Sequence, residues 1–354
     1  MALNNLLIRS DTSVQIGTGH IMRCLALAQA WQEREGEALF VMADMSSALE
    51  NRLLMEGMKV VHLSGIAGGL EDATVTMDAA QKFNAQWVVV DGYHFGKDYQ
   101  KLIKDAKLNL LFIDDYGHAG YYYADLVLNQ NISADIDLYP SREPYTKLLL
   151  GTEYVLLRRE FWLWRNWQRE TQSVANKILV TLGGSDPDNV TLRVIRALQL
   201  LNIDGMEVIV IIGGSNPYHQ ILQQEISTSN LVITLRQNVN NMPQLMAWAD
   251  IAIAAGGSTN WELAFMGLPS LVISVADNQI AIAKGLNQQG VISYLGCYQQ
   301  VGLSQIHQAL QELRYDRCKR EIMSEKGQKL VDGYGGNRVV LEINKMLKFS
   351  TEEA

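Results

Sequence analysis

The sequence IGTGHIMRCLALA at Ile16–Ala28 decides the fold of the N-terminal half of this chain. It follows the apolar segment Leu6–Ser10, so an apolar run, a polar loop and a second apolar run come one after another. This order predicts a strand, a tight turn and a helix. Gly17 and Gly19 allow the backbone to turn sharply and to approach a ligand, because neither residue has a Cβ atom.

His20 directly follows the second glycine and falls in the first turn of the predicted helix. The positive end of the helix dipole disfavours an imidazolium there, so we expect a neutral imidazole that can accept a proton. Such a group at the mouth of a strand–helix crevice is a candidate general base. A hydrogen bond from His20 to a backbone carbonyl, with no catalytic role, is the alternative.

The size and composition of the chain indicate a soluble protein of two domains. The chain has 354 residues, which is more than one core usually supports. Its 48% of hydrophobic residues and 19% of charged residues are typical of globular proteins. The net charge of −8 and the lack of a Lys/Arg cluster exclude a nucleic-acid surface, although one diphosphate needs only a few local donors.

The cysteine content and the N-terminal sequence favour a cytoplasmic location. Cys24, Cys297 and Cys318 are far apart and form no CxxC motif, which disfavours a disulfide framework and a cysteine-based zinc site. The first residues show no basic segment followed by a long apolar one, as a secretory signal would. No apolar run has the length of a membrane span.

Short apolar segments alternate with segments of helical period along both halves of the chain. Strands that are apolar on both faces and separated by helices predict a parallel sheet covered on both sides. In the N-terminal half the predicted strands are Ala38–Ala43, Lys59–Leu63, Trp87–Asp91, Leu108–Asp114 and Leu126–Leu128. In the C-terminal half they are Lys177–Leu182, Val208–Ile212, Leu231–Leu235, Ile251–Ala255 and Ser270–Val275.

A change of pattern near residues 168–176 predicts the domain boundary. The aromatic segment Phe161–Trp167 precedes it and is interpreted as a helix at the end of the first domain. We therefore expect an N-terminal domain of residues 1–170, which carries His20, and a C-terminal domain of residues 171–354. The last predicted helix, Asn337–Leu347, is a candidate to pack back on the N-terminal domain.

Several predicted strands of the N-terminal half end in polar residues. These ends are Asp91–His94, Asp114–Tyr116 and Asn129–Asn131. In a doubly wound sheet the carboxyl ends of the strands face the ligand crevice. The same residue types also occur in ordinary turns, so the pattern alone does not separate the two interpretations.

Three predicted strands of the C-terminal half run into the same tripeptide. These are Gly183-Gly184-Ser185, Gly213-Gly214-Ser215 and Gly256-Gly257-Ser258. Helix starts are predicted directly after them, with Asp186-Pro187, Asn216-Pro217 and Ser258-Thr259 as N-cap residues and proline first in two of the helices. Glycine-rich turns that open into helices bind anions through backbone N–H groups, so three of them favour a diphosphate site.

Two polar positions after these turns have both a binding and a structural interpretation. Glu262 could accept hydrogen bonds from both hydroxyl groups of a ribose, or it could complete a capping box that starts at Thr259. Asn278 and Gln279 offer uncharged donors and acceptors for sugar hydroxyl or acetamido groups, or they begin a helix.

Other motifs exclude the common cofactors. Met22 stands where a dinucleotide fingerprint needs glycine, and the chain has no P-loop, so we expect no nicotinamide, flavin or other cofactor. Asp135-Ile136-Asp137 is the D-x-D pattern that holds a metal on a diphosphate in some transferases. Because so short a pattern is common by chance, we expect no metal site there.

Over nearly its whole length the chain resembles the UDP-2,4-diacetamido-2,4,6-trideoxy-β-L-altropyranose hydrolases of pseudaminic acid biosynthesis. The resemblance implies two Rossmann-like domains that face each other across a cleft, the GT-B arrangement, and kinship with the transferase that adds N-acetylglucosamine to the peptidoglycan lipid precursor. The matching stretches are Arg9–Asp11, Ile16–Ala28, Asp91–Tyr93, Ile113–Asp115, Leu128–Asn131, Gly183–Pro187, Ala255–Glu262 and Asn278-Gln279. Arg159 and Asp277 depart from the pattern of the family.

The resemblance also implies roles for individual residues. His20 is similar to the base that activates water in this family, and Glu262 to a carboxylate that binds the ribose. The other implied substrate-binding residues are Gly19 beside the base, Tyr93 and Asn278 in the sugar pocket, and Gly256, Gly257, Ser258 and Thr259 at the diphosphate. The implied reaction is attack of water on the anomeric carbon of a UDP-sugar with inversion. A GT-B glycosyltransferase with another acceptor and a protein that binds UDP-sugars without turnover are the alternatives.

Overall fold

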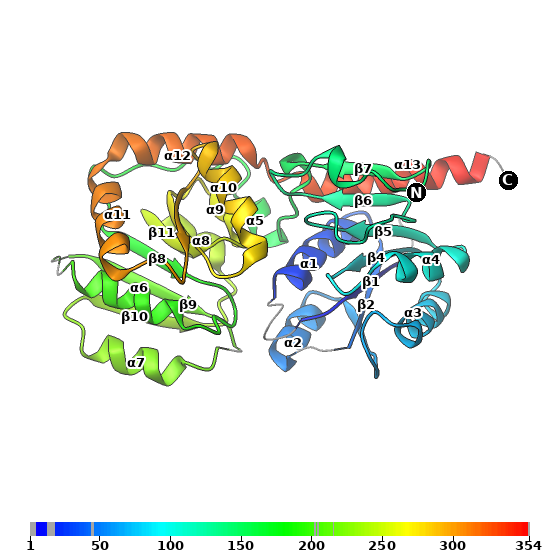
Figure 1. The fold of residues 1–354 in the computed structure, drawn as a ribbon, viewed down its shortest axis with the longest axis horizontal. Coiled ribbons are helices and arrows are strands. Elements are labelled where there is room, and N and C mark those ends of the chain that lie inside the picture. Colours follow the sequence, from blue (N-terminus) through cyan, green and yellow to red (C-terminus); the bar gives the residue numbers. More distant parts are fainter. Residues whose placement is uncertain are drawn as a thin grey trace. The chain divides into compact units, whose positions relative to one another are not determined.

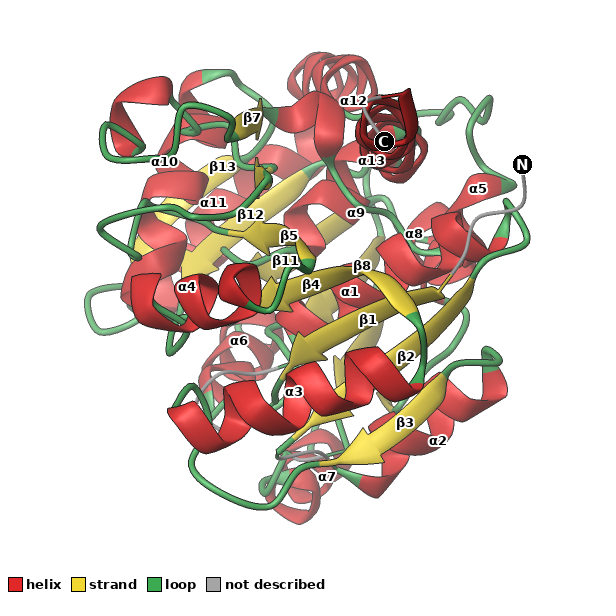
Figure 2. Cartoon of the chain, turned by 90° about the vertical axis from the view of Figure 1, so that its right-hand side faces the viewer, coloured by secondary structure: helices red, strands yellow, loops and turns green. Residues whose placement is uncertain are grey.

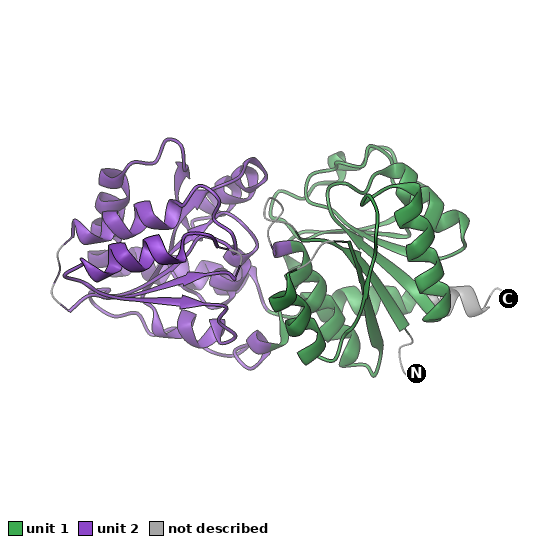
Figure 3. Ribbon diagram, turned by 90° about the horizontal axis from the view of Figure 1, so that it is seen from below, with its two compact units in different colours: residues 1–13, 20–159, 333–354 green, residues 14–19, 160–332 purple. Residues whose placement is uncertain are grey.

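The computed structural model describes residues 5–12, 18–43, 46–201, 203, 205–214 and 216–352. Ile16, Gly17 and Ser215 of the predicted motifs lie outside the described residues. The described chain divides into two compact units (Figure 3). Unit 1 comprises residues 1–13, 20–159 and 333–354, and unit 2 comprises residues 14–19 and 160–332.

Unit 1 is built on a seven-stranded parallel sheet with the strand order β3-β2-β1-β4-β5-β6-β7 (Figure 1). Helices α3 and α4 cover one face of this sheet, and α1 lies on the other face (Figure 2). The strands are β1 Asn5–Ser10, β2 Glu37–Met42, β3 Lys59–His62, β4 Ala85–Asp91, β5 Asn109–Ile113, β6 Leu126–Asn129 and β7 Lys147–Leu150. The helices are α1 Gly19–Gln32, α2 Ser47–Met55, α3 Leu70–Lys82, α4 Lys97–Asp105 and α13 Gly335–Glu352, with one-turn 3₁₀ helices at Ile136–Leu138 and Thr152–Tyr154.

Unit 2 repeats this plan with a six-stranded parallel sheet of order β10-β9-β8-β11-β12-β13. The strands are β8 Lys177–Thr181, β9 Glu207–Ile212, β10 Val232–Gln237, β11 Ile251–Ala255, β12 Ser270–Ser274 and β13 Ser293–Cys297. The helices are α6 Val190–Gln199, α7 His219–Ser227, α8 Met242–Trp248, α9 Thr259–Phe265, α10 Ile280–Gln288, α11 Leu303–Tyr315 and α12 Arg317–Leu330, with a 3₁₀ turn at Asp277–Gln279. Helix α5, Arg159–Trp162, lies where one unit ends and the other begins.

The sequence predicted the central strands of both sheets, and it missed β7 and β13. Strands such as β11 and β12 are buried along their whole length, because neighbours and helices cover them on every side. Strands β7 and β13 lie at the sheet edges and are only partly buried. The opposite edge strands, β3 and β10, are also partly exposed and were predicted, so edge position alone does not explain the two omissions.

In each sheet the order of the strands reverses at one point. The chain runs from β1 outward to β3 and then returns to β4 on the other side of β1, and the same reversal lies between β8 and β11. In open parallel sheets, ligands bind outside the carboxyl ends of the strands at such a reversal. The start of α1 and the turn between β11 and α9 both occupy this position.

Two predicted helix starts in unit 2 are wrong by a few residues. Helix α6 begins at Val190 and α7 at His219, so neither Pro187 nor Pro217 is the first helical residue. Asp186 nevertheless caps α6 from the preceding loop, because its carboxylate accepts the N–H groups of Val190 and Thr191 at 2.9 and 2.8 Å. The prediction that Asp186 caps this helix is therefore confirmed, although the loop between Asp186 and the helix is longer than predicted.

The aromatic segment after residue 160 is mostly not helical. Helix α5 ends at Trp162, after four residues. Phe161 is fully buried and its ring contacts Phe265 in unit 2 at 6.2 Å between centroids. Trp164 packs edge-on against Trp167 at 5.4 Å. These rings hold the connecting segment by packing, which needs no regular helix.

The last helix, α13, belongs to unit 1. It begins at Gly335, two residues before the predicted start. A Cβ atom on Gly335 would lie 2.2 Å from the carbonyl oxygen of Val155, and one on Gly336 would lie 3.0 Å from the Cβ of Ala30. Close contact of the helix with unit 1 therefore requires these glycines. None of the helices in the described residues is long and apolar enough to span a membrane.

Candidate functional site

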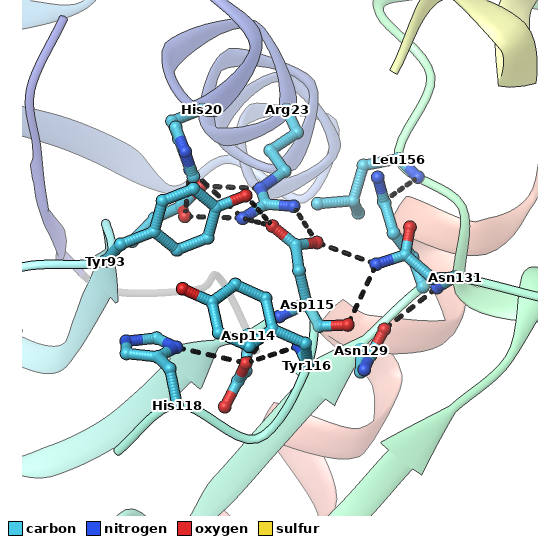
Figure 4. A network of polar contacts seen from close by, with 12 residues as sticks. His20, Arg23, Tyr93, Asp114, Asp115, Tyr116, His118, Asn129, Asn131 and Leu156 are labelled. Carbon is cyan, nitrogen blue, oxygen red and sulfur yellow. Dashed lines mark hydrogen bonds and ion pairs between the residues drawn. The ribbon is translucent and has the colours of Figure 1, made fainter. Parts of the chain in front are cut away.

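His20 is the second residue of α1 and its side chain is 6% exposed. Its Nδ1 atom lies 2.6 Å from Oδ1 of Asp91, the last residue of β4 (Figure 4). Two lone pairs cannot approach to this distance, so Nδ1 carries the proton and donates it to the carboxylate. Nε2, which has no hydrogen-bond partner among the described residues, is then the ring atom that can accept a proton.

Arg23 fixes the carboxylate that holds His20. It lies one turn further along α1, and its Nε and Nη2 atoms donate to the two oxygens of Asp91, each at 2.7 Å. Burial alone would raise the pKa of Asp91, but the charge of Arg23 and the contact with His20 hold that pKa well below its usual range. Asp91 is therefore an ionised acceptor with a fixed orientation.

Asp115, which follows β5, binds the other side of the same guanidinium. Nη1 of Arg23 donates to Oδ1 of Asp115 at 2.7 Å. The hydroxyl group of Tyr93 donates to Oδ2 at 2.8 Å, and Nδ2 of Asn131 donates to Oδ1 at 2.8 Å. The carboxyl ends of β4, β5 and β6 thus converge on the first turn of α1 (Figure 4), as the polar strand ends of the sequence predicted.

Tyr93 lies directly against the candidate base. Its ring meets the ring of His20 edge-on, with 4.8 Å between centroids and 83° between planes. The side chain is partly buried and its hydroxyl group is held by Asp115. The structure therefore brings together two residues, His20 and Tyr93, that the sequence had singled out separately.

A second buried network supports the loop that carries Tyr93. Arg9 on β1 donates to Asp72 at 2.9 and 2.7 Å and to Asp11 at 2.6 Å. The other oxygen of Asp11 lies 3.1 Å from Nε2 of His94, the residue after Tyr93. This explains the Arg9-Ser10-Asp11 motif, because its two charged residues brace the strand end next to the candidate base.

Four residues of this cluster were not predicted as site residues from the sequence: Arg23, Asp91, Asp115 and Asn131. Arg23 had a detectable signal, because residues three apart on a helix lie on the same face and Arg23 follows His20 by three. Asp91, Asp115 and Asn131 were recognised only as polar strand ends. Their mutual contacts depend on the strand order, which no local pattern contains.

In unit 2 the turn Gly256-Gly257-Ser258 joins β11 to α9. The side chain of Asn260 is fully buried and donates from Nδ2 to the carbonyl oxygens of Ala255 and Gly257, both at 2.8 Å. These bonds hold the backbone of the turn in one shape.

The amide donors of this turn divide into two groups. The N–H group of Gly256 donates to Oε1 of Gln279 at 3.1 Å. Those of Gly257, Ser258 and Thr259 donate to none of the described residues. The N–H groups of Gly257, Ser258 and Thr259 are therefore the candidate donors to an anion. Gly256 has no Cβ atom, which allows the close approach of Gln279.

The structure excludes one of the two interpretations of Glu262, the capping box. The N-cap of α9 is Ser258, whose side chain makes no capping bond, so Glu262 is the fourth helical residue. A capping box that starts at Thr259 is therefore absent. The ribose-binding role of Glu262 stays a prediction.

Asn278 and Gln279 lie in the 3₁₀ turn after β12 and differ in exposure. Asn278 is exposed, and Gln279 is partly buried between the ends of β11 and β12. Besides Gly256, Oε1 of Gln279 accepts the N–H group of Val275 at 2.9 Å. Gln279 thus has a structural role, and the sugar-binding role of Asn278 stays a prediction.

The D-x-D pattern forms a turn. Asp135 is the N-cap of the 3₁₀ helix Ile136–Leu138 and accepts the N–H group of Asp137 at 2.9 Å. Within the described ranges, no group of three or more His, Cys, Asp or Glu side chains is arranged to hold a metal ion.

Part of the chain matches the model of a known protein family. Residues 178–333 match the model of the glycosyltransferase family 28 C-terminal domain. These residues include the turn at Gly256, Asn278 and all six strands of unit 2 apart from the first residue of β8. Unit 2 is thus similar to the C-terminal domain of an enzyme family.

Several curated proteins are similar to most of the chain at low identity. A UDP-2,4-diacetamido-2,4,6-trideoxy-β-L-altropyranose hydrolase of Campylobacter jejuni is 26% identical over 288 residues, which are 80% of this chain and 97% of that protein. The spore coat polysaccharide biosynthesis protein SpsG of Bacillus subtilis is 27% identical over 94% of this chain and 95% of its own. An uncharacterised protein of Methanocaldococcus jannaschii is 26% identical over 75% of this chain, and the match spans 54% of that longer protein.

A solved structure identifies the fold. MurG of Acinetobacter baumannii superimposes with a TM-score of 0.66 over 97% of this chain and 99% of its own, at 17% sequence identity. The two parallel-sheet domains therefore form the GT-B fold that the sequence predicted.

Proposed function

We propose that this protein hydrolyses UDP-2,4-diacetamido-2,4,6-trideoxy-β-L-altropyranose to UDP and the free sugar. The hydrogen bond of 2.6 Å between His20 and Asp91 carries the proposal, because it leaves Nε2 of a buried imidazole as a proton acceptor at the strand reversal of unit 1. The similarity to a hydrolase of this name supports the choice of substrate.

In the proposed reaction His20 activates a water molecule. The water oxygen forms a bond to C1 of the sugar from the face opposite the diphosphate while its proton passes to Nε2 of His20. The bond between C1 and the diphosphate oxygen breaks, and its electron pair leaves with UDP. Asp91 stabilises the imidazolium that forms, and Arg23 keeps Asp91 in place. The configuration at C1 is inverted.

Unit 2 supplies the proposed binding site for UDP. The backbone N–H groups of Gly257, Ser258 and Thr259 donate to the diphosphate, and Glu262 accepts from the ribose hydroxyl groups. Asn278 and Tyr93 contact the sugar. Hydrogen bonds to the departing diphosphate meet its negative charge, so the proposal requires no metal ion.

Release of UDP in the absence of any added acceptor tests the proposal. The purified protein is incubated with a panel of UDP-sugars in water enriched in oxygen-18, and the products are followed by NMR and mass spectrometry. We expect the label on C1 of the free sugar, with inverted configuration in the first spectra. Label on a phosphate would show cleavage of a P–O bond and would contradict the mechanism.

The match of unit 2 to a glycosyltransferase domain favours a second candidate function. In that case the sugar passes to an acceptor hydroxyl group, and His20 removes the proton of that group instead of a water proton. Acceptor dependence separates the two functions, because a transferase releases UDP at a substantial rate only when its acceptor is present.

A further inference from the structure

The loop after β5 is held by a single buried carboxylate. Asp114 accepts the backbone N–H groups of Tyr116 and Gly117 at 2.9 and 3.0 Å and lies 3.1 Å from Nδ1 of His118. Its other oxygen accepts the hydroxyl group of Tyr122. Although burial acts in the opposite direction, the contacts with His118 and Tyr122 lower the pKa of Asp114 to about 2, so the carboxylate is ionised at neutral pH.

The same loop requires glycine at position 117. This residue has a φ angle of +79°, and a Cβ atom there would lie 2.6 Å from the carbonyl oxygen of Leu138. Only glycine satisfies both conditions. Together with the hydrogen bonds to Asp114, this backbone conformation positions Tyr116.

Tyr116 is half exposed and contacts Tyr93, the neighbour of the candidate base. Its side chain is 50% exposed, with ring centroids 5.3 Å from Tyr93 and 5.5 Å from His118. Tyr93 in turn contacts His20. The four rings form one continuous cluster at the carboxyl ends of β4 and β5, with Tyr116 as its open member (Figure 4).

An aromatic ring at this position fits a particular part of the substrate. In the proposed reaction, C1 of the sugar lies next to the water that His20 activates, so the group closest to the ring cluster is the sugar itself. A 6-deoxy sugar carries a methyl group and C–H groups that form an apolar surface. Such a surface packs favourably on an exposed aromatic ring that is already held in place.

We propose that Tyr116 is a specificity-determining residue that packs its ring against the apolar face and the C6 methyl group of the sugar. This inference rests on the proposed function, since it places the sugar of a UDP-sugar at His20. It assigns a role to a residue whose exposed ring the proposed mechanism does not use. The ring makes the contact, so phenylalanine can replace tyrosine at this position.

The test compares affinities for the UDP-sugar and for UDP alone. His20→Ala serves as the background, so that UDP-2,4-diacetamido-2,4,6-trideoxy-β-L-altropyranose is not consumed during calorimetric titration. We expect Tyr116→Ala to weaken binding of the UDP-sugar about three- to tenfold and to leave UDP binding unchanged. Tyr116→Phe should keep the ratio of the two affinities.

Tyr145 provides a matched control. It is 49% exposed, precedes β7, and therefore lies at the opposite, amino-terminal edge of the same sheet. Tyr145→Ala should change neither affinity. An unchanged ratio in Tyr116→Ala, or an equal change in Tyr145→Ala, would overturn the proposal.

The same measurement separates this proposal from the proposed function. If the protein with His20 intact binds the UDP-sugar more tightly than UDP but releases no UDP, hydrolysis is wrong, and the ratio in Tyr116→Ala still decides the role of the ring. If the protein shows no preference for the UDP-sugar over UDP, the sugar site itself is refuted.

Discussion

Unit 1 and unit 2 place their candidate sites at the same point of the same topology but build them from different groups. In unit 1 the site consists of the imidazole of His20 and the charged side chains of Asp91, Arg23 and Asp115, which are bound to one another in a buried cluster. In unit 2 it consists of backbone N–H groups, with an amide side chain, that of Asn260, holding the turn.

The difference follows from what each site is proposed to do. A proton acceptor must be one atom with a fixed orientation, and a neighbouring carboxylate provides that orientation. A diphosphate needs several donors at once, which a tight backbone turn offers without burying a charge. In the proposed function, one fold therefore serves proton transfer in one unit and anion binding in the other.

Replacing His20 should produce the largest effect. We expect His20→Ala to lower turnover by about 10²–10⁴-fold, the usual contribution of a positioned base, and to leave UDP affinity nearly intact. Initial rates of UDP release and calorimetric titration with UDP measure the two quantities. Added imidazole should restore part of the rate, because it can occupy the space of the missing ring. Turnover within a few-fold of the original rate would refute the assignment of the base.

Lowering the pH should destabilise the site of unit 1 more than the site of unit 2. The pKa values of four buried carboxyl groups in unit 1, and of the partly buried Asp115, are lowered by their ion pairs and hydrogen bonds; the four are Asp11, Asp72, Asp91 and Asp114. Their folded-state pKa values lie below the unfolded ones, so these contacts stabilise the protein fully above about pH 4 and are lost as the pH falls below that value. For Asp114, whose pKa is lowered to about 2, the loss is about 2 kcal/mol.

Cleavage by pepsin between pH 5 and pH 2 measures this difference. We expect the first cuts within residues 20–159, because the turn of unit 2 is held by groups that do not titrate in this range. Asp114→Asn should reduce the dependence of unfolding on pH, since asparagine does not titrate. Earlier cleavage within residues 177–297 would show that the buried carboxylates do not control acid stability.

Replacing Glu262 tests the proposed UDP-binding site of unit 2. We expect Glu262→Ala to weaken UDP binding about tenfold, the size of a lost hydrogen bond to a charged group. Asp98 in the first turn of α4 is a matched control, because it also places an acidic side chain at a helix start. Asp98→Ala should leave UDP binding unchanged. Unchanged affinity in Glu262→Ala, with a lowered melting temperature, would assign Glu262 a structural role.

Removal of divalent ions should have the smallest effect. We expect the same rate of UDP release with and without excess chelator, because backbone donors meet the charge of the leaving group. Asp135→Ala together with Asp137→Ala should also change little, since Asp135 serves as a helix cap. A loss of activity on chelation that magnesium or manganese restores would show that the turn at Gly256 is insufficient.

The periodicity of the sequence was enough to predict most of the fold. Doubly apolar strands separated by helices specify parallel sheets, because such strands are stable only when both faces are covered. The helix start after Asp186 was predicted a few residues early, since a cap can act from a preceding loop. The edge strands β3 and β10 were predicted, whereas the edge strands β7 and β13 were missed.

The sequence by itself determined which residues could do chemistry: a histidine at a helix start, polar strand ends and glycine-rich turns. Only the tertiary structure decided which of them act together. Asp91, Asp115 and Asn131 belong to three different strand ends. Asp91 and Asp115 both bind Arg23, and Asn131 binds Asp115, because β4, β5 and β6 are neighbours in one sheet. Local sequence sets the properties of each side chain, whereas the contacts between distant residues arise from strand order and burial, which the whole chain determines.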